Sequence, residues 1–175
     1  ALAGLPIPKR MRWGDRDDEF VRPVQWVVLL FGDEVIPATI LGVAAGRETH
    51  GHRFHRPQPI RLTAPADYAR QLTSEGQVIA DFAARRAAIR AQAEAVATEL
   101  RGTAVIKPEL LDEVTALVEW PVALAGNFER RFLNVPAEAL ISTMQDNQRY
   151  FPVVDTQGRL LPHFITIANL ESRDP

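Results

Sequence analysis

The fold of this 175-residue chain is predicted most strongly by the stretch Tyr150-Phe-Pro-Val-Val-Asp-Thr-Gln-Gly-Arg-Leu-Leu-Pro-His-Phe-Ile-Thr-Ile-Ala168. Its two apolar runs, 150–154 and 160–168, contain β-branched and aromatic residues, which favour strands. The residues between them, Asp155 to Gly158, have a composition typical of a tight turn. The sequence therefore predicts a hairpin at this point.

A long helix is predicted over residues 76–101. Ser74 and Gln77 have the spacing of a capping box, and Gly102 is a typical residue to end a helix. The apolar residues of this segment recur on one stripe: Val78, Phe82, Ile89, Ala93, Val96 and Leu100.

Shorter helices are expected to begin near Pro65, Pro108 and Pro136, because proline favours the first helical position. In the second, Leu110, Val114 and Leu117 share one face, and the third extends over 136–146. Between these two helices, residues 118–125 have the composition of a strand, which a turn at Gly126-Asn127 ends.

The N-terminal half contains a second hairpin. Residues 23–31 form an apolar run, which predicts a strand buried on both faces. Gly32-Asp33 suits a type II′ turn into a second strand over 34–42. Pro37 places that strand at a sheet edge or a bulge, since proline has no N–H to donate.

These elements do not alternate as strand and helix, so a doubly wound sheet is not expected. The order predicts an α+β fold: a mixed, mostly antiparallel sheet with helices packed beside it. We expect residues 1–19 to form a linker or docking arm, because Leu5-Pro-Ile-Pro8 cannot be helical. Residues 20–175 are expected to form a single domain.

Composition excludes several classes of protein. The absence of cysteine excludes disulfides, thiol nucleophiles and Cys-ligated metals. No apolar run reaches the roughly 18 residues of a membrane span, and no signal peptide is recognisable, so we expect a cytoplasmic protein. The net charge of -2 implies that any contact with nucleic acid is a local patch.

The densest polar stretch is Arg47-Glu-Thr-His-Gly-His-Arg-Phe-His-Arg56. It lacks the carboxylates that would complete a metal site, whereas arginine forks and histidine donors match phosphates. The alternative is a solvated loop held down by Phe54. The candidate nucleic-acid-binding residues are Arg47, His50, His52, Arg53, His55 and Arg56, joined by Gln148 and Arg149, which either contact RNA or cap a helix.

No catalytic set is recognisable. No serine has the Gly-x-Ser-x-Gly setting of a hydrolase nucleophile, no phosphate-binding glycine motif is present, and the carboxylates are scattered. We therefore expect no catalytic site, metal or cofactor within this chain.

Six strings, in this order, resemble the β subunit of bacterial heterotetrameric glycyl-tRNA synthetase. They extend over nearly the whole chain: residues 5–14, 20–26, 51–54, 118–122, 135–144 and 147–153. The chain differs from the family pattern at Gln25, where the family has His, and at Arg149, where it has Lys.

The resemblance implies an internal segment of a β subunit that binds tRNA(Gly), similar in kind to the B3/B4 domain of the phenylalanyl-tRNA synthetase β subunit. The α subunit of the α2β2 enzyme would bind glycine and ATP with Mg. Other β domains and the α subunit are the implied partners.

Three roles for the segment are open: holding tRNA near its acceptor arm, hydrolytic editing of mischarged tRNA, or a purely architectural role in β folding or α–β assembly. Editing is needed where a smaller or isosteric competitor enters the first site. No amino acid is smaller than glycine, so we favour the tRNA-holding role.

Overall fold

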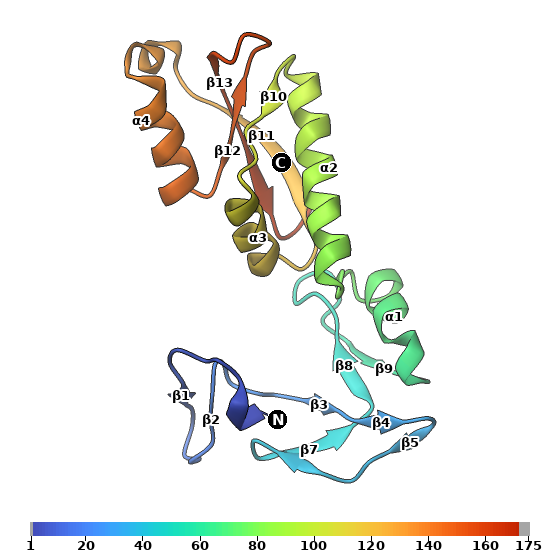
Figure 1. Ribbon diagram of the computed structural model, residues 1–175. Coiled ribbons are helices and arrows are strands. Elements are labelled where there is room, and N and C mark those ends of the chain that lie inside the picture. Colours follow the sequence, from blue (N-terminus) through green and yellow to red (C-terminus); the bar gives the residue numbers. More distant parts are fainter. Residues whose placement is uncertain (1, 172–175) are drawn as a thin grey trace. The chain divides into compact units, whose positions relative to one another are not determined.

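In the computed structural model, which describes residues 2–171, the C-terminal hairpin lies inside a four-stranded antiparallel sheet (Figure 1). The order of its strands is β10-β12-β13-β11. They extend over Thr103–Ala104 (β10), Phe151–Val154 (β12), Leu160–Ala168 (β13) and Val122–Asn127 (β11). Phe151 pairs with Ile165 inside β13, and Val122 pairs with Ala168 at the C-terminal end of that strand. The predicted hairpin is confirmed.

Two helices, α2 (Phe82–Glu99) and α3 (Pro108–Leu117), pack against this sheet. Small side chains on α2 allow a close approach, because Ala93 and Ala97 are buried beside Ile89. The fully buried members of the core come from both layers: Ile89, Ala93, Leu111, Phe151, Val153 and Ile165. On α3 the predicted face is wrong at Leu117, which is 64% exposed, while Leu111 is buried.

The predicted start of the long helix is wrong by about one and a half turns. Ser74 does not cap it, because its hydroxyl donates to the carbonyl of Arg70, at 2.9 Å, within α1 (Tyr68–Ser74). Gln77 has a φ of 51°, which no α-helix contains. Asp81 caps α2 instead, accepting a hydrogen bond from the N–H of Ala84 at 2.7 Å.

Two glycines have roles that differ from those predicted. Gly102 follows Arg101, which has the positive φ of 57° at the helix end. Gly102 is required by packing, since a Cβ on it would lie 2.5 Å from Cγ1 of Val153. Gly126 does not turn the chain but lies within β11, where the ring of Phe164 covers it. Phe164 in turn stacks on Tyr150, with ring centroids 4.4 Å apart.

The helix predicted over residues 136–146 consists of an α-helical part and a π-helical part. The segment Arg130–Asn134 (η3) forms a 3₁₀ helix, and α4 (Ala137–Ser142) continues into a π-helical turn, Thr143–Asn147 (η4). Of the predicted inward residues of this helix, Met144 is buried, whereas Leu140 and Ile141 are only half-buried.

The N-terminal residues form short strands in several small sheets. The first of these, β1 (Met11–Arg12), pairs with β2 (Glu19–Phe20). A parallel pair joins β3 (Val27–Val28) to β7 (Val43–Gly46), and β6 (Thr39–Ile40) lies antiparallel to β7. The other pairs are β4 (Leu30–Phe31) with β5 (Glu34–Val35), and β8 (Glu48–His50) with β9 (Pro59–Arg61); short 3₁₀ turns cover Leu2–Gly4 (η1) and Pro65–Asp67 (η2).

The predicted turn at Gly32-Asp33 is confirmed: Phe31 pairs with Glu34, and Gly32 has a φ of 56°. The prediction that residues 23–31 are one strand buried on both faces is wrong. The run is divided at Leu29, because β3 pairs with β7 while β4 folds back on β5. No single sheet buries it, and Phe31 and Trp26 are 79% and 43% exposed.

The α+β class and the mostly antiparallel pairing are confirmed, but the strands form several sheets instead of one. The chain divides into two compact units, Ala1–Gly76 and Gln77–Pro175. The division into an arm over 1–19 and a domain over 20–175 stays a prediction, because compactness does not measure independent folding. Within residues 2–171, no helix has the length and apolar character needed to cross a membrane.

Leu111→Ala tests the core of the second unit. Leu111 is fully buried, so we expect a loss of about 2–5 kcal/mol in the free energy of unfolding, measured by urea denaturation. Leu117→Ala is the matched control on the same helix, and its effect should stay below about 0.5 kcal/mol. Equal losses for the two variants would show that this core is wrongly identified.

The turn between β12 and β13 gives a pH-dependent prediction. The N–H groups of Arg159 and Gln157 and the Arg159 guanidinium hold the pKa of Asp155 below its ordinary value of 3.8. The carboxylate therefore stabilises the fold above that pH, and the contribution is lost as pH falls through the folded pKa. Asp155→Asn should be less stable than the parent at pH 7, and the difference should shrink towards pH 2; a difference independent of pH would contradict this.

Candidate nucleic-acid interface

The candidate residues 47–56 lie on and beyond the β8–β9 hairpin of the first unit. Thr49 pairs with Ile60 and His50 with Pro59, so residues 51–58 form the loop that joins the two strands. Thr49, Ile60 and Leu62 are buried, which anchors the base of the loop in a small core. His50 at the end of β8 contacts Trp26, with ring centroids 4.5 Å apart.

The loop begins with a backbone contact between two glycines. A Cβ on Gly51 would lie 2.5 Å from the carbonyl oxygen of Gly76, and a Cβ on Gly76 would lie 3.2 Å from Cα of Gly51. The N–H of His52 donates to the Gly76 carbonyl at 2.7 Å. Because neither residue has a side chain, the loop lies directly against the chain that leaves α1.

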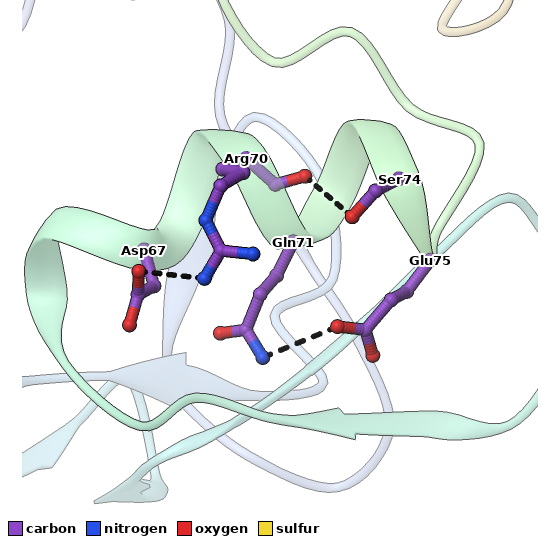
Figure 2. A network of polar contacts seen from close by, with 5 residues as sticks. All are labelled: Asp67, Arg70, Gln71, Ser74 and Glu75. Carbon is purple, nitrogen blue, oxygen red and sulfur yellow. Dashed lines mark hydrogen bonds and ion pairs between the residues drawn. The ribbon is translucent and has the colours of Figure 1, made fainter.

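Polar contacts stabilise α1 itself (Figure 2). Asp67 before the helix pairs with Arg70 at 2.7 Å, and this hydrogen bond holds the pKa of Arg70 above its ordinary value. Nε2 of Gln71 lies 3.5 Å from a carboxylate oxygen of Glu75. These contacts lie along the helix that ends at Ser74, close to Gly76, so they support the segment against which the loop packs.

His52 is the centre of the loop and is 1% exposed. Its Nδ1 accepts from the N–H groups of Phe54 and His55, each at 3.3 Å, and its carbonyl accepts from the N–H of Arg56 at 2.8 Å. The ring of His55 lies 4.6 Å from that of His52 and is half-buried. His52 therefore orders the loop from inside, and a buried ring does not offer a surface to a phosphate.

Arg47 also has a structural role. Its guanidinium donates to the carbonyl of Leu62 at 3.3 Å and to the carbonyl of Asp33. It therefore joins β8 and β9 to the turn between β4 and β5. A guanidinium satisfied by backbone carbonyls has fewer donors left for a ligand.

The outward side chains of the loop are Arg53, Phe54 and Arg56, all exposed. Phe54 is 69% exposed, so the loop is held down by His52 and not by Phe54. Within residues 2–171, no carboxylate pairs with Arg53 or Arg56. Both arginines are available to an anionic ligand, and the buried histidine fixes the backbone that carries them.

Gln148 and Arg149 belong to the other unit. Nε of Arg149 lies 2.6 Å from a carboxylate oxygen of Glu113, and its guanidinium also donates to the carbonyl of Asp146. Gln148 is exposed, and its N–H donates to Thr143 at 3.3 Å, closing the π-helical turn. The structure thus explains Arg149 by a contact within the second unit, between the residues that follow η4 and helix α3.

A second feature of the first unit was not predicted from the sequence. Arg53 shares a hollow of about 500 Å³ with Phe20, Arg22, Gln25 and Trp26. The sequence gives little indication of this hollow, because residues 23–31 have the composition of a buried strand. Only the exposure of Trp26 shows that the ring belongs to a surface.

Within residues 2–171, no group of three or more His, Asp or Glu side chains is placed to hold a metal ion. The spacing of His50, His52 and His55 therefore does not translate into a ligand set, because His52 points into the loop and accepts backbone hydrogen bonds.

Comparisons with known proteins agree on one family. A family model described as "Glycyl-tRNA synthetase beta subunit" matches residues 1–175. Proteins named glycine–tRNA ligase beta subunit are similar over the full chain: 61% identical in Hahella chejuensis, 59% in Pseudomonas fluorescens and 59% in Stutzerimonas stutzeri. The chain covers 25% of the length of each of these relatives.

Gly51→Ala tests the contact on which the loop depends. The added Cβ collides with the Gly76 backbone, so we expect a loss of about 1–3 kcal/mol in stability. Faster amide hydrogen exchange at His52 should accompany it, because that N–H loses its partner. Gly46→Ala is the control, since a Cβ there meets nothing within 4 Å; slower or unchanged exchange in Gly51→Ala would refute the contact.

Proposed function

Because the chain belongs to the family of glycyl-tRNA synthetase β subunits, we propose that it is a tRNA-binding part of a glycine–tRNA ligase. In this proposal the 51–58 loop contacts the sugar–phosphate backbone of tRNA(Gly), near its acceptor arm. The contact holds the RNA for charging by the α subunit. The segment itself is non-catalytic.

The proposal rests on Arg53 and Arg56, which are exposed and which have no carboxylate partner among residues 2–171. A guanidinium presents a planar fork that matches two phosphate oxygens. Arginines on a flexible loop would lose conformational entropy on binding. Here the backbone beneath them is already held by His52 and Gly51, so less entropy is lost. Exposed arginines on an ordered loop are suited to phosphate contact.

The proposal for the whole enzyme follows from the family. We expect an α2β2 assembly in which the α subunit binds ATP with Mg and glycine, and in which further β domains share the tRNA. We also propose that this segment is related in fold to the B3/B4 domain of phenylalanyl-tRNA synthetase and that the enzyme is cytoplasmic. The net charge of -2 supports a shared contact, because the segment alone attracts phosphates weakly.

The contacts of Arg47 and His52 separate the tRNA-holding role from the architectural one. The side chains of Arg47 and His52 form hydrogen bonds with the backbone of their own unit, which is what a purely architectural role requires. Arg53 and Arg56 have no such use within the described residues, and an architectural role leaves them unexplained. For editing, the size of glycine remains the argument against, since no smaller competitor exists.

The double variant Arg53→Gln/Arg56→Gln in the intact enzyme tests the function. We expect the KM for tRNA to rise on the order of tenfold, because two charge-assisted contacts are lost. The salt dependence of tRNA binding should weaken by roughly one unit of log–log slope per lost phosphate contact. ATP- and glycine-dependent pyrophosphate exchange should be unchanged, because the α subunit performs that step.

The matched control removes two exposed arginines that are already paired. Arg12 lies 3.4 Å from Asp17, and Arg61 lies 3.9 Å from Glu48. Arg12→Gln/Arg61→Gln changes the net charge equally and should leave the KM for tRNA near that of the parent. If the two double variants have the same tRNA kinetics, the loop is not the contact. Loss of α–β assembly without loss of RNA affinity would favour the architectural role.

A further inference from the structure

The hollow beside the loop has an unusual lining. Its charged side chains are Arg22 and Arg53, its rings are Phe20 and Trp26, and it contains no carboxylate. A hollow in the second unit differs in this respect, since Glu113 and Asp146 lie beside Arg149 there. A lining with two cations and two rings is complementary to an anionic ligand that has a flat apolar part.

Trp26 is held in place although the residue is 43% exposed. The residues that follow it, Val27 and Val28, pair with β7, which orders the backbone next to the ring. One side of the ring contacts His50 at 4.5 Å, on the strand that leads into the 51–58 loop. An ordered, exposed indole offers a flat surface on which a second ring can stack at low entropic cost.

We propose that this hollow binds one unpaired nucleotide of RNA. The base stacks on Trp26, and the adjoining phosphates contact the guanidinium groups of Arg22 and Arg53. The inference rests on the proposed tRNA-binding function and deepens it, because it adds an unpaired base to the phosphate contacts of the loop.

The size and chemistry of the hollow favour a nucleotide over a duplex. Its volume of about 500 Å³ is in the range of small-ligand sites. The bases of a duplex are stacked on one another, whereas unpaired bases are free to stack on aromatic side chains with arginines on the backbone. Arg53 belongs both to this hollow and to the exposed face of the loop, so one RNA strand is able to contact both.

A protein surface is the principal competing occupant, since Trp and Arg also dominate protein interfaces. The charges argue against it: the lining has two arginines and no carboxylate, which suits an anionic partner, and the adjoining loop adds Arg56 with the same sign. Binding of the α subunit by each variant gives this occupant its own readout.

The test compares Trp26→Ala, Trp26→Phe and Arg22→Gln in the intact α–β enzyme, with tRNA(Gly) transcript as the probe. Trp26→Ala should weaken tRNA binding roughly 5- to 100-fold, as expected for the loss of one stacked base. Its salt slope should equal that of the parent, because no phosphate contact is lost. Trp26→Phe should bind within about threefold of the parent, because a ring remains. Arg22→Gln should lower the salt slope by about one unit.

Two controls separate stacking from other effects. Phe31→Ala removes an aromatic ring that is 79% exposed in the same unit but outside the hollow, and it should bind tRNA as the parent does. A blunt-ended RNA duplex offers no unpaired base, so its weak binding should be the same for Trp26→Ala and the parent. Amide hydrogen exchange at His52 shows whether each variant keeps the loop intact.

The outcomes distinguish this inference from the function on which it rests. If Trp26→Ala binds tRNA like the parent while Arg53→Gln/Arg56→Gln binds weakly, the hollow is not a base site and the loop function stands. If Trp26→Ala and Arg22→Gln bind weakly while Arg53→Gln/Arg56→Gln binds like the parent, the base site at Trp26 stands, whereas the phosphate contacts of Arg53 and of the loop are refuted. If Trp26→Ala binds tRNA normally but loses the α subunit, the hollow is a protein interface and the inference is overturned.

Discussion

The meeting of two backbones at Gly51 and Gly76 is the constraint on which the candidate interface depends. A side chain at either position would separate the loop from the end of α1, and the hydrogen bond from His52 to the Gly76 carbonyl would be lost. With that bond in place, the His52 ring is buried and organises the N–H groups of Phe54 and His55 around its Nδ1. The exposure of Arg53 and Arg56 follows from the burial of His52.

The second unit depends on close approach in a similar way. Ala93 and Ala97 allow α2 to lie near the sheet, and Gly102 allows the chain to pass beside Val153. In β11, Gly126 makes room for the Phe164 ring, which then stacks on Tyr150. Small residues thus determine where large ones fit, because a packed interior tolerates few voids and little overlap.

The arginines fall into two groups, those that bind other parts of the protein and those that are exposed to solvent. Arg47 and Arg149 bind carbonyls and a carboxylate of the protein itself, so they contribute to the fold. Arg22, Arg53 and Arg56 are exposed around one loop and one hollow of the first unit. A chain of net charge -2 attracts RNA only where such a group is concentrated. The proposed interface is therefore local, and it is suited to act together with other domains of a synthetase.

The features that were predicted correctly are those that depend on neighbouring residues. The β12–β13 hairpin, the Gly32-Asp33 turn and the helix that begins at Pro108 were all predicted, because turns and helix starts follow from the chemistry of a few adjacent residues. The family was also recognisable from ordered strings along the chain. By contrast, Asp81 displaced the predicted capping box at Ser74, since several caps in one segment compete and spacing alone does not choose among them.

Long-range packing, and not local composition, determines which of the predicted site residues face inward. His52 and Arg47 have the same composition cues as Arg53 and Arg56, but their partners, Gly76, Leu62 and Asp33, are remote in sequence. Trp26 is the reverse case. Its apolar run predicts burial, yet the residue is exposed because β3 and β4 pair with different strands. Burial is set by what packs against a residue, and for these side chains the partners come from distant parts of the chain.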